Sequence, residues 1–349
     1  NKKVDFNYDI KMNIPNKITY KTCLAINSSP GSQRGIEETF NSNLNPMVNE
    51  NKIIYFEHDC IKLGITNAIN KLIIDIQDYK PDILIFFHIA NIKVPDDFVS
   101  KLYNVLPKVK IIYDEGDMFG GLGKPMLSHM KKFMKSVDGV FIRGLGDWYK
   151  ECFKYNKKTI YVPHINSLPL VNQNLYKINR KACFVGNKIT TRKGPIFRLP
   201  GASNREKLVK YLDSHIPDFE IYGKGWGNLK SYKGLIQFDD QDLLYNDITY
   251  HFSYEHYPKI PLYWSDRMPI SLYRGQIYIT HEHGLYSQYF KDTKGVFFFK
   301  NKQEALEIYK FLLTRNEDDL RELRISNATH AKKIFDSISI YNNALKQVI

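Results

Sequence analysis

The stretch KIIYFEHDCIKLGITNAINKLIIDIQDYKPDILIFFH, residues 52–88, has the pattern of a strand, a helix and a second strand. Its two ends, Lys52–Phe56 and Ile83–Phe87, are short runs rich in β-branched and aromatic residues. Between them, apolar residues recur with the 3.6-residue period of one helix face, at Ile61, Ile65, Ala68, Ile69, Leu72, Ile73 and Ile76. This order of elements is typical of a parallel sheet with helices on its faces.

The same alternation extends from Thr22 to Pro163 and predicts a first Rossmann-like domain over residues 1–165. Further strands are expected at Thr22–Asn27, Lys110–Tyr113, Gly139–Ile142 and Thr159–Val162. Pro125 and Asp147 are expected to start two more helices, because proline suits the first helical turn and aspartate caps it.

An Asn-rich polar stretch, residues 166–180, is expected to link this domain to a second α/β domain over residues 181–330. The strands of the second domain are expected at Ala182–Val185, Phe219–Tyr222, Ile248–Phe252, Gln276–Thr280 and Val296–Phe299. Ser203 and Asn301 each precede a glutamate by three residues, the spacing of a helix-capping box. Residues 331–349 are expected to form a C-terminal helix that crosses back to the first domain. The predicted fold class is α/β, with two Rossmann-like domains facing each other across a cleft.

The composition limits the class of protein. Hydrophobic residues make up 43% and charged residues 25% of the 349 residues, which is typical of a globular chain. Because the longest apolar runs are far below the roughly 20 residues of a membrane span, and no secretory signal is apparent, we expect a cytoplasmic protein without a transmembrane segment. The net charge of +13 favours anionic partners such as nucleotide sugars, nucleic acid or acidic membranes, although a general lysine bias would give the same number.

Candidate site residues follow the expected strands, because ligands of open α/β sheets bind beyond the carboxyl ends of the strands. These positions hold Ser28–Arg34, His88, Asp114–Asp117 and Gly186-Asn187. Glu115 and Asp117 belong to an acidic cluster that could supply a base for an acceptor hydroxyl. Asp117 could equally stabilise a turn.

The segment Tyr263–Met268 predicts an anion site. Asp266 is suited to cap a helix that ends at Gly275, which places Arg267 at the helix N-terminus. The partial positive charge and free N–H groups of that end, together with a guanidinium, would hold a diphosphate. Positive charge there would also stabilise the phosphate that departs when a sugar–nucleotide bond breaks. The alternative is a surface cap and salt bridge between Asp266 and Arg267.

Five segments follow one another along the second half of the chain: Phe184–Asn187, Asn204-Arg205, Ile221–Trp226, Tyr263–Arg267 with Gly275, and Gly284-Leu285. In this order they resemble the glycosyltransferases related to bacterial spore-maturation proteins, the CgeB-like family. The resemblance covers about residues 181–335, while the first half matches only in the order of strands and helices.

The resemblance implies a GT-B fold that binds a nucleotide-sugar donor with its second domain and an acceptor with its first. The donor-binding residues it implies are Gly186, Asn187, Arg192, Arg205, Tyr222, Gly223, Trp226, Ser265, Asp266, Arg267, Gly284 and Leu285. Among these, the arginines would neutralise the diphosphate, Tyr222 to Trp226 would border the nucleotide, and Gly284 and Leu285 would lie near the donor sugar. In the first domain, His88 would face the reacting sugar. One position departs from the family pattern, because Ile270 replaces a glutamate that commonly bonds the donor ribose.

The function expected from these residues is transfer of a hexose from a nucleotide-sugar donor, UDP-hexose above all, to a hydroxyl acceptor on a glycan, a protein or modified DNA. If the anomeric centre inverts, Asp117 or Glu115 is the expected base; if it is retained, no base is required. Three alternatives stay open. The net charge of +13 suggests a glycosyltransferase that acts on hydroxymethylated DNA bases. Ile270 suggests a catalytically silent relative that binds sugar nucleotide or glycan. A sugar-nucleotide epimerase would use the same fold.

No obligatory cofactor and no metal are expected. His281-Glu282-His283 lacks a third ligand, and His251, Glu255 and His256 are expected to be polar loop residues. Gly120–Pro125 departs from the P-loop pattern and is predicted to be a mobile glycine loop. Gly223–Gly227 departs from the dinucleotide fingerprint and is predicted to be a tight turn.

Overall fold

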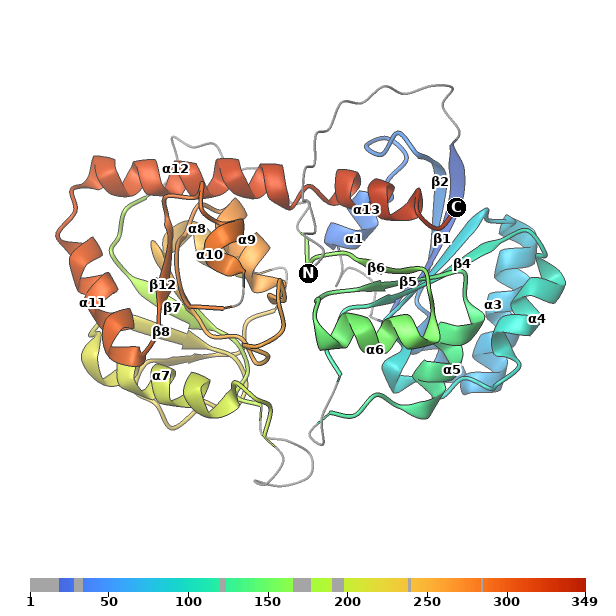
Figure 1. Ribbon diagram of the computed structural model, residues 1–349, viewed down its shortest axis with the longest axis horizontal. Helices are drawn as coiled ribbons and strands as arrows, with labels where there is room; N and C mark the ends of the chain where they lie inside the picture. The colour runs from blue at the N-terminus through green and yellow to red at the C-terminus, as the bar shows by residue number, and fades with distance from the viewer. Residues whose placement is uncertain are drawn as a thin grey trace.

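The computed structural model describes residues 19–27, 34–119, 124–165, 177–189, 198–237, 240–283 and 285–349. In these ranges the chain forms two parallel sheets of six strands, each flanked by helices, in two lobes that lie side by side (Figure 1). The predicted α/β fold class with two Rossmann-like halves is confirmed.

The sheet of the first lobe has the strand order β2-β1-β3-β4-β5-β6, and its strands pair in parallel. The strands are β1 (Tyr20–Ala25), β2 (Val48–Ile54), β3 (Ile83–Phe87), β4 (Lys110–Glu115), β5 (Gly139–Ile142) and β6 (Thr159–Tyr161). The helices that alternate with them are α1 (Arg34–Thr39), α2 (Phe56–Leu63), α3 (Ile65–Tyr79), α4 (Phe98–Val105), α5 (Ser128–Ser136) and α6 (Asp147–Tyr155), with a 3-10 turn η1 (Ile89–Asn91) after β3.

The second sheet has the order β12-β11-β10-β7-β8-β9, again in parallel. Its strands are β7 (Ala182–Val185), β8 (Phe219–Tyr222), β9 (Tyr232–Gly234), β10 (Tyr250–Ser253), β11 (Ile277–His281) and β12 (Val296–Phe299). The helices are α7 (Ala202–His215), α8 (Gln241–Asp247), α9 (Arg267–Tyr273), α10 (Tyr286–Tyr289), α11 (Lys302–Leu313) and α12 (Glu317–Ile334), followed by α13 (Ser337–Leu345).

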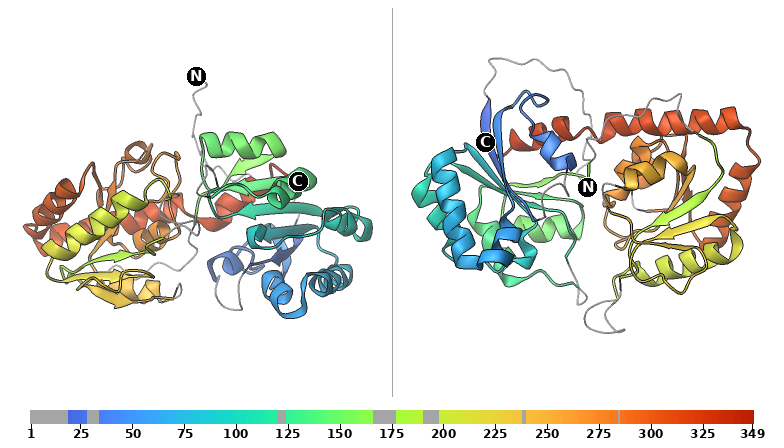
Figure 2. Two further views of the ribbon diagram at one scale, coloured as in Figure 1. Left: turned by 90° about the horizontal axis from the view of Figure 1, so that it is seen from below. Right: turned by 180° about the vertical axis from the view of Figure 1, so that it is seen from behind.

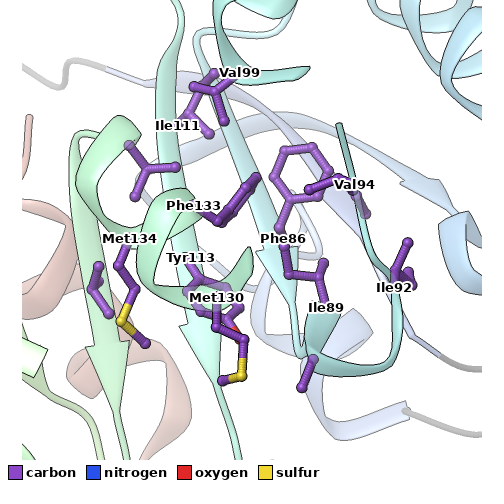
Figure 3. Close-up of a cluster of buried hydrophobic side chains, with 14 of the residues drawn as sticks. Phe86, Ile89, Ile92, Val94, Val99, Ile111, Tyr113, Met130, Phe133 and Met134 are labelled. Carbon is purple, nitrogen blue, oxygen red and sulfur yellow. The ribbon is translucent and has the colours of Figure 1, made fainter. Parts of the chain in front are cut away.

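An aromatic cluster forms one core of the first lobe (Figure 3). Phe133 of α5 packs against Phe86 of β3 and Tyr113 of β4, with 5.3 Å between ring centroids in both pairs. Such edge-on packing of buried rings favours a single arrangement of helix on sheet. It thereby fixes the ends of β3 and β4, where the candidate residues of this lobe begin.

The two lobes contact each other through the loops beyond the carboxyl ends of their strands. Leu145 donates its backbone N–H to Pro261 O at 3.0 Å, and Trp264 Nε1 donates to His164 O at 3.1 Å. The hydroxyl of Tyr257 donates to Met118 O at 3.2 Å. The carboxyl ends of the two sheets therefore face each other.

The chain also crosses between the lobes near its end. α12 lies along the second lobe and α13 lies on the first, as the red segments of Figures 1 and 2 show. Tyr341, Ala344 and Leu345 of α13 share a buried cluster with residues of β1 and β3. The C-terminal helix expected over residues 331–349 is therefore interrupted, because α12 ends at Ile334 and α13 begins at Ser337.

Several local expectations differ from the structure. Gly64, with φ of +77°, separates α2 from α3. As a result Ile61, predicted on the buried helix face, is 78% exposed. α5 begins at Ser128 instead of Pro125, and α7 begins at Ala202, so that Ser203 lies inside the helix and does not cap it. By contrast, Asn301 caps α11 as predicted, with its Oδ1 accepting from the backbone of Gln303 and Glu304.

The predicted mobile loop at Gly120–Pro125 falls largely outside the described residues, as does most of the predicted linker. None of the helices in the described ranges combines the length and the apolar composition that a bilayer span requires.

Candidate functional site

The loop after β7 is held in place by the turn after β8. Gly186 donates its N–H to Tyr222 O at 2.9 Å and accepts from Trp226 Nε1 at 2.7 Å, while Asn187 Oδ1 accepts from the backbone of Lys224 at 2.8 Å. Gly223 has φ of +124°, and a Cβ there would come within 2.5 Å of Gly186 O. Only glycine fits this contact, because the opposing atom belongs to the backbone.

Arg205 of α7 lies directly against this loop. Gly186 has φ of +155°, which other residues rarely adopt, and a Cβ at this position would come within 2.0 Å of Arg205 Nη2, so glycine leaves room for the guanidinium as it is placed. The guanidinium also lies over the ring of Phe184, 5.0 Å from its centroid. The side chain is 3% exposed, and its Nε and Nη1 have no hydrogen-bond partner within the described residues. Burial, together with the charge of Arg267, lowers the pKa of Arg205 to about 9.

Arg267 is the first residue of α9, and Asp266 caps that helix by accepting from its backbone N–H at 3.0 Å. The cap, the helix and the helix end at Gly275 therefore follow the sequence prediction. The guanidinium lies 3.6 Å from Asp266 Oδ1 and is 22% exposed. Burial lowers its pKa, but the carboxylates of Asp266 and Glu255 outweigh burial and raise it overall.

Glu255 is the site residue that sequence reasoning missed, because it was expected to be a polar loop residue. It is 2% exposed, and its Oε1 accepts from both the backbone N–H and the hydroxyl of Ser265 at 3.2 Å. Its negative charge opposes the lowering of the Arg205 pKa and contributes to the raised pKa of Arg267. His251 and His256, expected in the same polar loop, are buried as well. Position along the chain carries no signal of this burial.

The first lobe contributes a histidine–carboxylate pair. His88 follows β3 with φ of +47°, and its Nδ1 lies 2.5 Å from Glu115 Oε1 at the end of β4. Glu115 is fully buried and also accepts from the hydroxyl of Tyr113 and from the backbone N–H of Asp117. His88 Nε2 points instead toward Asp117, with 3.9 Å to Oδ2.

The charged side chains around His88 are paired with one another. Asp117 Oδ2 lies 2.6 Å from Lys124 Nζ, and the side chain is 51% exposed. Although burial opposes the effect, Lys124 and His88 lower the pKa of Asp117. Burial lowers the pKa of His88, but the hydrogen bond and charge of Glu115 outweigh it and raise the pKa overall. Because Glu115 holds Nδ1, Nε2 is the ring nitrogen through which His88 can exchange a proton.

His164 lies just after β6, the last strand of the first lobe. A Cβ at Gly116 would lie 3.9 Å from its ring, and its ring packs edge-on against Tyr263 of the second lobe. Burial and the nearby Arg143 lower the pKa of His164 to about 4. The charges of Asp117 in the first lobe and of Asp266 and Arg267 in the second also act on the pKa of His164.

The remaining predicted residues have different placements. Trp226 is 1% exposed, so it supports the Gly186 loop from below and has no free face to border a nucleotide. Tyr222 is partly exposed and donates to Glu220 Oε2 at 2.6 Å. Leu285 has φ of +73° and is 40% exposed. Ile270 is buried beside Cys183 and Val185. Arg192 and Gly284 lie outside the described residues.

In the part of the chain that the structure describes, no three His, Cys, Asp or Glu side chains are grouped so that they could hold a metal ion.

Comparisons with known proteins place the fold. No protein-family model and no curated protein matches the sequence. Among solved structures, Anabaena HepE in complex with UDP and glucose has a TM-score of 0.57 at 10% identity, covering 94% of this chain and 98% of that one. A mutant of T4 phage BGT in complex with UDP-glucose has a TM-score of 0.56 at 15% identity, covering 94% and 99%.

A mutant of Staphylococcus aureus TarM, in complex with fondaparinux, alpha-GlcNAc-glycerol and UDP, has a TM-score of 0.53 at 11% identity. It covers 80% of this chain, which spans 59% of the length of TarM. Taken together with the two parallel sheets, these likenesses show that the chain has the GT-B fold.

Proposed function

We propose that this protein is a glycosyltransferase that moves a hexose from a UDP-sugar to a hydroxyl acceptor. The observation that carries the proposal is the buried guanidinium of Arg205 beside the Gly186 loop, whose Nε and Nη1 have no hydrogen-bond partner among the described residues. Buried donors without acceptors are costly, and a diphosphate supplies hydrogen-bond acceptors and opposite charge. The UDP or UDP-glucose named for HepE, BGT and TarM supports a nucleotide-sugar ligand for this fold.

In this proposal the second domain, residues 181–330, holds the donor. Arg205 and Arg267 neutralise the diphosphate, Gly186 and Asn187 approach it, and Tyr222 with Gly223 lies toward the nucleoside. Arg192, Gly284 and Leu285 complete the donor side by the resemblance to the CgeB-like family. Because Glu255 and Asp266 keep Arg267 charged, that arginine can stabilise the charge that develops on the departing diphosphate.

The first domain, residues 1–165, holds the acceptor, and His88 is the proposed base. Glu115 is enclosed by three donors and Asp117 is paired with Lys124, so neither carboxylate is as free as His88 Nε2. The acceptor oxygen attacks the anomeric carbon, its proton passes to Nε2, and the bond to the diphosphate breaks. A single displacement of this kind inverts the anomeric centre. This assignment replaces the sequence-based choice of Asp117 or Glu115 as the base.

The location proposed for this reaction is the cytoplasm. All four cysteines, Cys23, Cys60, Cys152 and Cys183, are free thiols, which is typical of proteins in reducing compartments.

A panel of nucleoside diphosphates and their sugars, measured by thermal shift, tests the donor site. A specific ligand at 100 times its Kd adds about 2.7 kcal/mol to the free energy of unfolding. Arg267→Ala should abolish the shift, whereas Arg315→Ala, at an exposed arginine paired with Asp319, should keep it. Undiminished UDP binding by Arg267→Ala would refute the site. Slow hydrolysis of UDP-glucose without acceptor separates an active enzyme from a silent binding protein.

A further inference from the structure

The last two helices connect the donor and acceptor sides of the site. We call residues 317–349, which comprise α12 and α13, the C-terminal arm. In α12, the buried Arg324 donates from Nε to Gly275 O at 3.0 Å and from Nη2 to Arg274 O at 3.2 Å. These carbonyls belong to the two residues that directly follow α9, the helix that begins with Arg267.

The other helix of the arm reaches a buried carboxylate of the first lobe. The hydroxyl of Tyr341 in α13 donates to Asp114 Oδ2. Arg143 donates to that hydroxyl at 3.0 Å, and its Nη2 lies 2.6 Å from Asp114 Oδ1. Tyr341, Asp114 and Arg143 are at most 4% exposed. Since an ionised carboxylate is stable in such surroundings only when it is paired and hydrogen-bonded, the position of Asp114 depends on these two partners.

Asp114 in turn holds the backbone of His88, one member of the histidine–carboxylate pair. Its carbonyl accepts from the backbone N–H of His88 at 2.8 Å, directly where His88 adopts its left-handed conformation. The next residue is Glu115, whose side chain lies on the opposite face of β4 because side chains alternate along a strand. Two adjacent residues therefore hold His88: the carbonyl of Asp114 accepts from its backbone, and the carboxylate of Glu115 orients its ring.

We propose that Tyr341 is a positioning residue for the His88–Glu115 pair, acting through Asp114, and that the C-terminal arm thereby connects the donor helix α9 with the proton-accepting histidine. The inference rests on the proposed glycosyl transfer for its catalytic consequence. A purely structural tyrosine would stabilise the protein without affecting the His88 ring. A positioning tyrosine affects the distance between His88 Nδ1 and Glu115, and with it the protonation of His88.

Tyr341→Phe tests this, because it removes one hydroxyl and keeps the ring that packs against Phe40 and Phe141. Lys158→Ala is the matched control, since Lys158 Nζ donates to Val348 O at 3.0 Å and anchors the same arm without touching Asp114. For Tyr341→Phe we expect kcat to fall on the order of 10- to 100-fold through misplacement of the base. The KM for the UDP-sugar should stay within about twofold, and the pKa of His88, followed by NMR of the imidazole ring, should fall. Lys158→Ala should change neither kcat nor the His88 titration.

Two results would overturn the proposal. One is a Tyr341→Phe protein with a lower Tm but an unchanged His88 titration and unchanged kcat. The other is a Lys158→Ala protein with the same losses as Tyr341→Phe. If Tyr341→Phe does not fold, Asp114→Asn serves in its place with the same expected result. The His88 titration needs no turnover, so the positioning role is decided even if the wild-type protein binds no UDP-sugar and the proposed function fails.

Discussion

Replacing Arg205 with methionine tests whether this arginine binds the ligand or stabilises the core of the lobe. The pKa of Arg205 is lowered to about 9 from the ordinary arginine value above 12, by burial and by the charge of Arg267. At 1.36 kcal/mol for each pKa unit, keeping this guanidinium charged costs the free protein on the order of 5 kcal/mol. Methionine fills similar apolar space over Phe184 and carries no charge, so part of that cost is removed.

We therefore expect the free Arg205→Met protein to be at least as stable as the wild type. At about 2 °C per kcal/mol for a chain of this size, the expected rise in Tm is up to several degrees. The same variant should bind UDP at least about 100-fold more weakly, because it lacks two charge-assisted hydrogen bonds worth about 1.5–3 kcal/mol each.

Differential scanning fluorimetry with and without UDP, followed by calorimetric titration, measures both quantities in one series. Arg315→Met, at an exposed arginine, is the control and should leave Tm and affinity unchanged. The reasoning is refuted if Arg205→Met lowers the Tm of the free protein by many degrees while the UDP-induced shift persists. That outcome would assign Arg205 to the core of the lobe rather than to a ligand.

Glu115→Gln should lower the pKa of His88, because burial then acts without the opposing carboxylate; imidazole NMR would contradict this if the titration did not move. Gly223→Ala should weaken UDP binding and reduce stability by about 1–3 kcal/mol, because the new Cβ would clash with the backbone of Gly186 and the residue has a positive φ. Gly227→Ala is the control: its Cβ would lie 3.9 Å from the nearest atom, so urea melts should show unchanged stability. Three buried histidines have their pKa lowered to about 3, 2 and 3 by burial: His251, His256 and His281. Below pH 6.5 these histidines bind protons in the unfolded chain but stay neutral in the folded one, so the free energy of unfolding should decrease as the pH falls. The expected loss is about 2 kcal/mol per histidine at pH 5. Urea melts from pH 7 to 5 that show no change in stability would disprove it.

Local pattern was sufficient for much of the fold. Alternating β-branched runs and helical periodicity predict parallel strands such as Ile83–Phe87 and Ala182–Val185, which the structure has at the same bounds. The Asp266 cap and the helix end at Gly275 were also predictable, because each depends on residues within one or two turns. The expectations that were wrong, such as the buried Ile61 and the Ser203 cap, come from places where a glycine changes the helix phase or start.

Burial and long-range pairing depended on the tertiary structure. Arg205 is ordinary in the sequence, and its Nε and Nη1 lack hydrogen-bond partners among the described residues only because the fold buries them beside the Gly186 loop. Glu115 was an expected base, yet its three donors place it as the partner of His88. The sequence alone determined the alternation of strands and helices in two parallel sheets, except for the short strand β9, and the helix tip that carries Arg267. Only the tertiary structure decided which buried polar atoms lack partners, and that the hydroxyl of Tyr341 donates to Asp114, 227 residues away. The physical reason is that the cost of burying a charge depends on neighbours that only folding brings together.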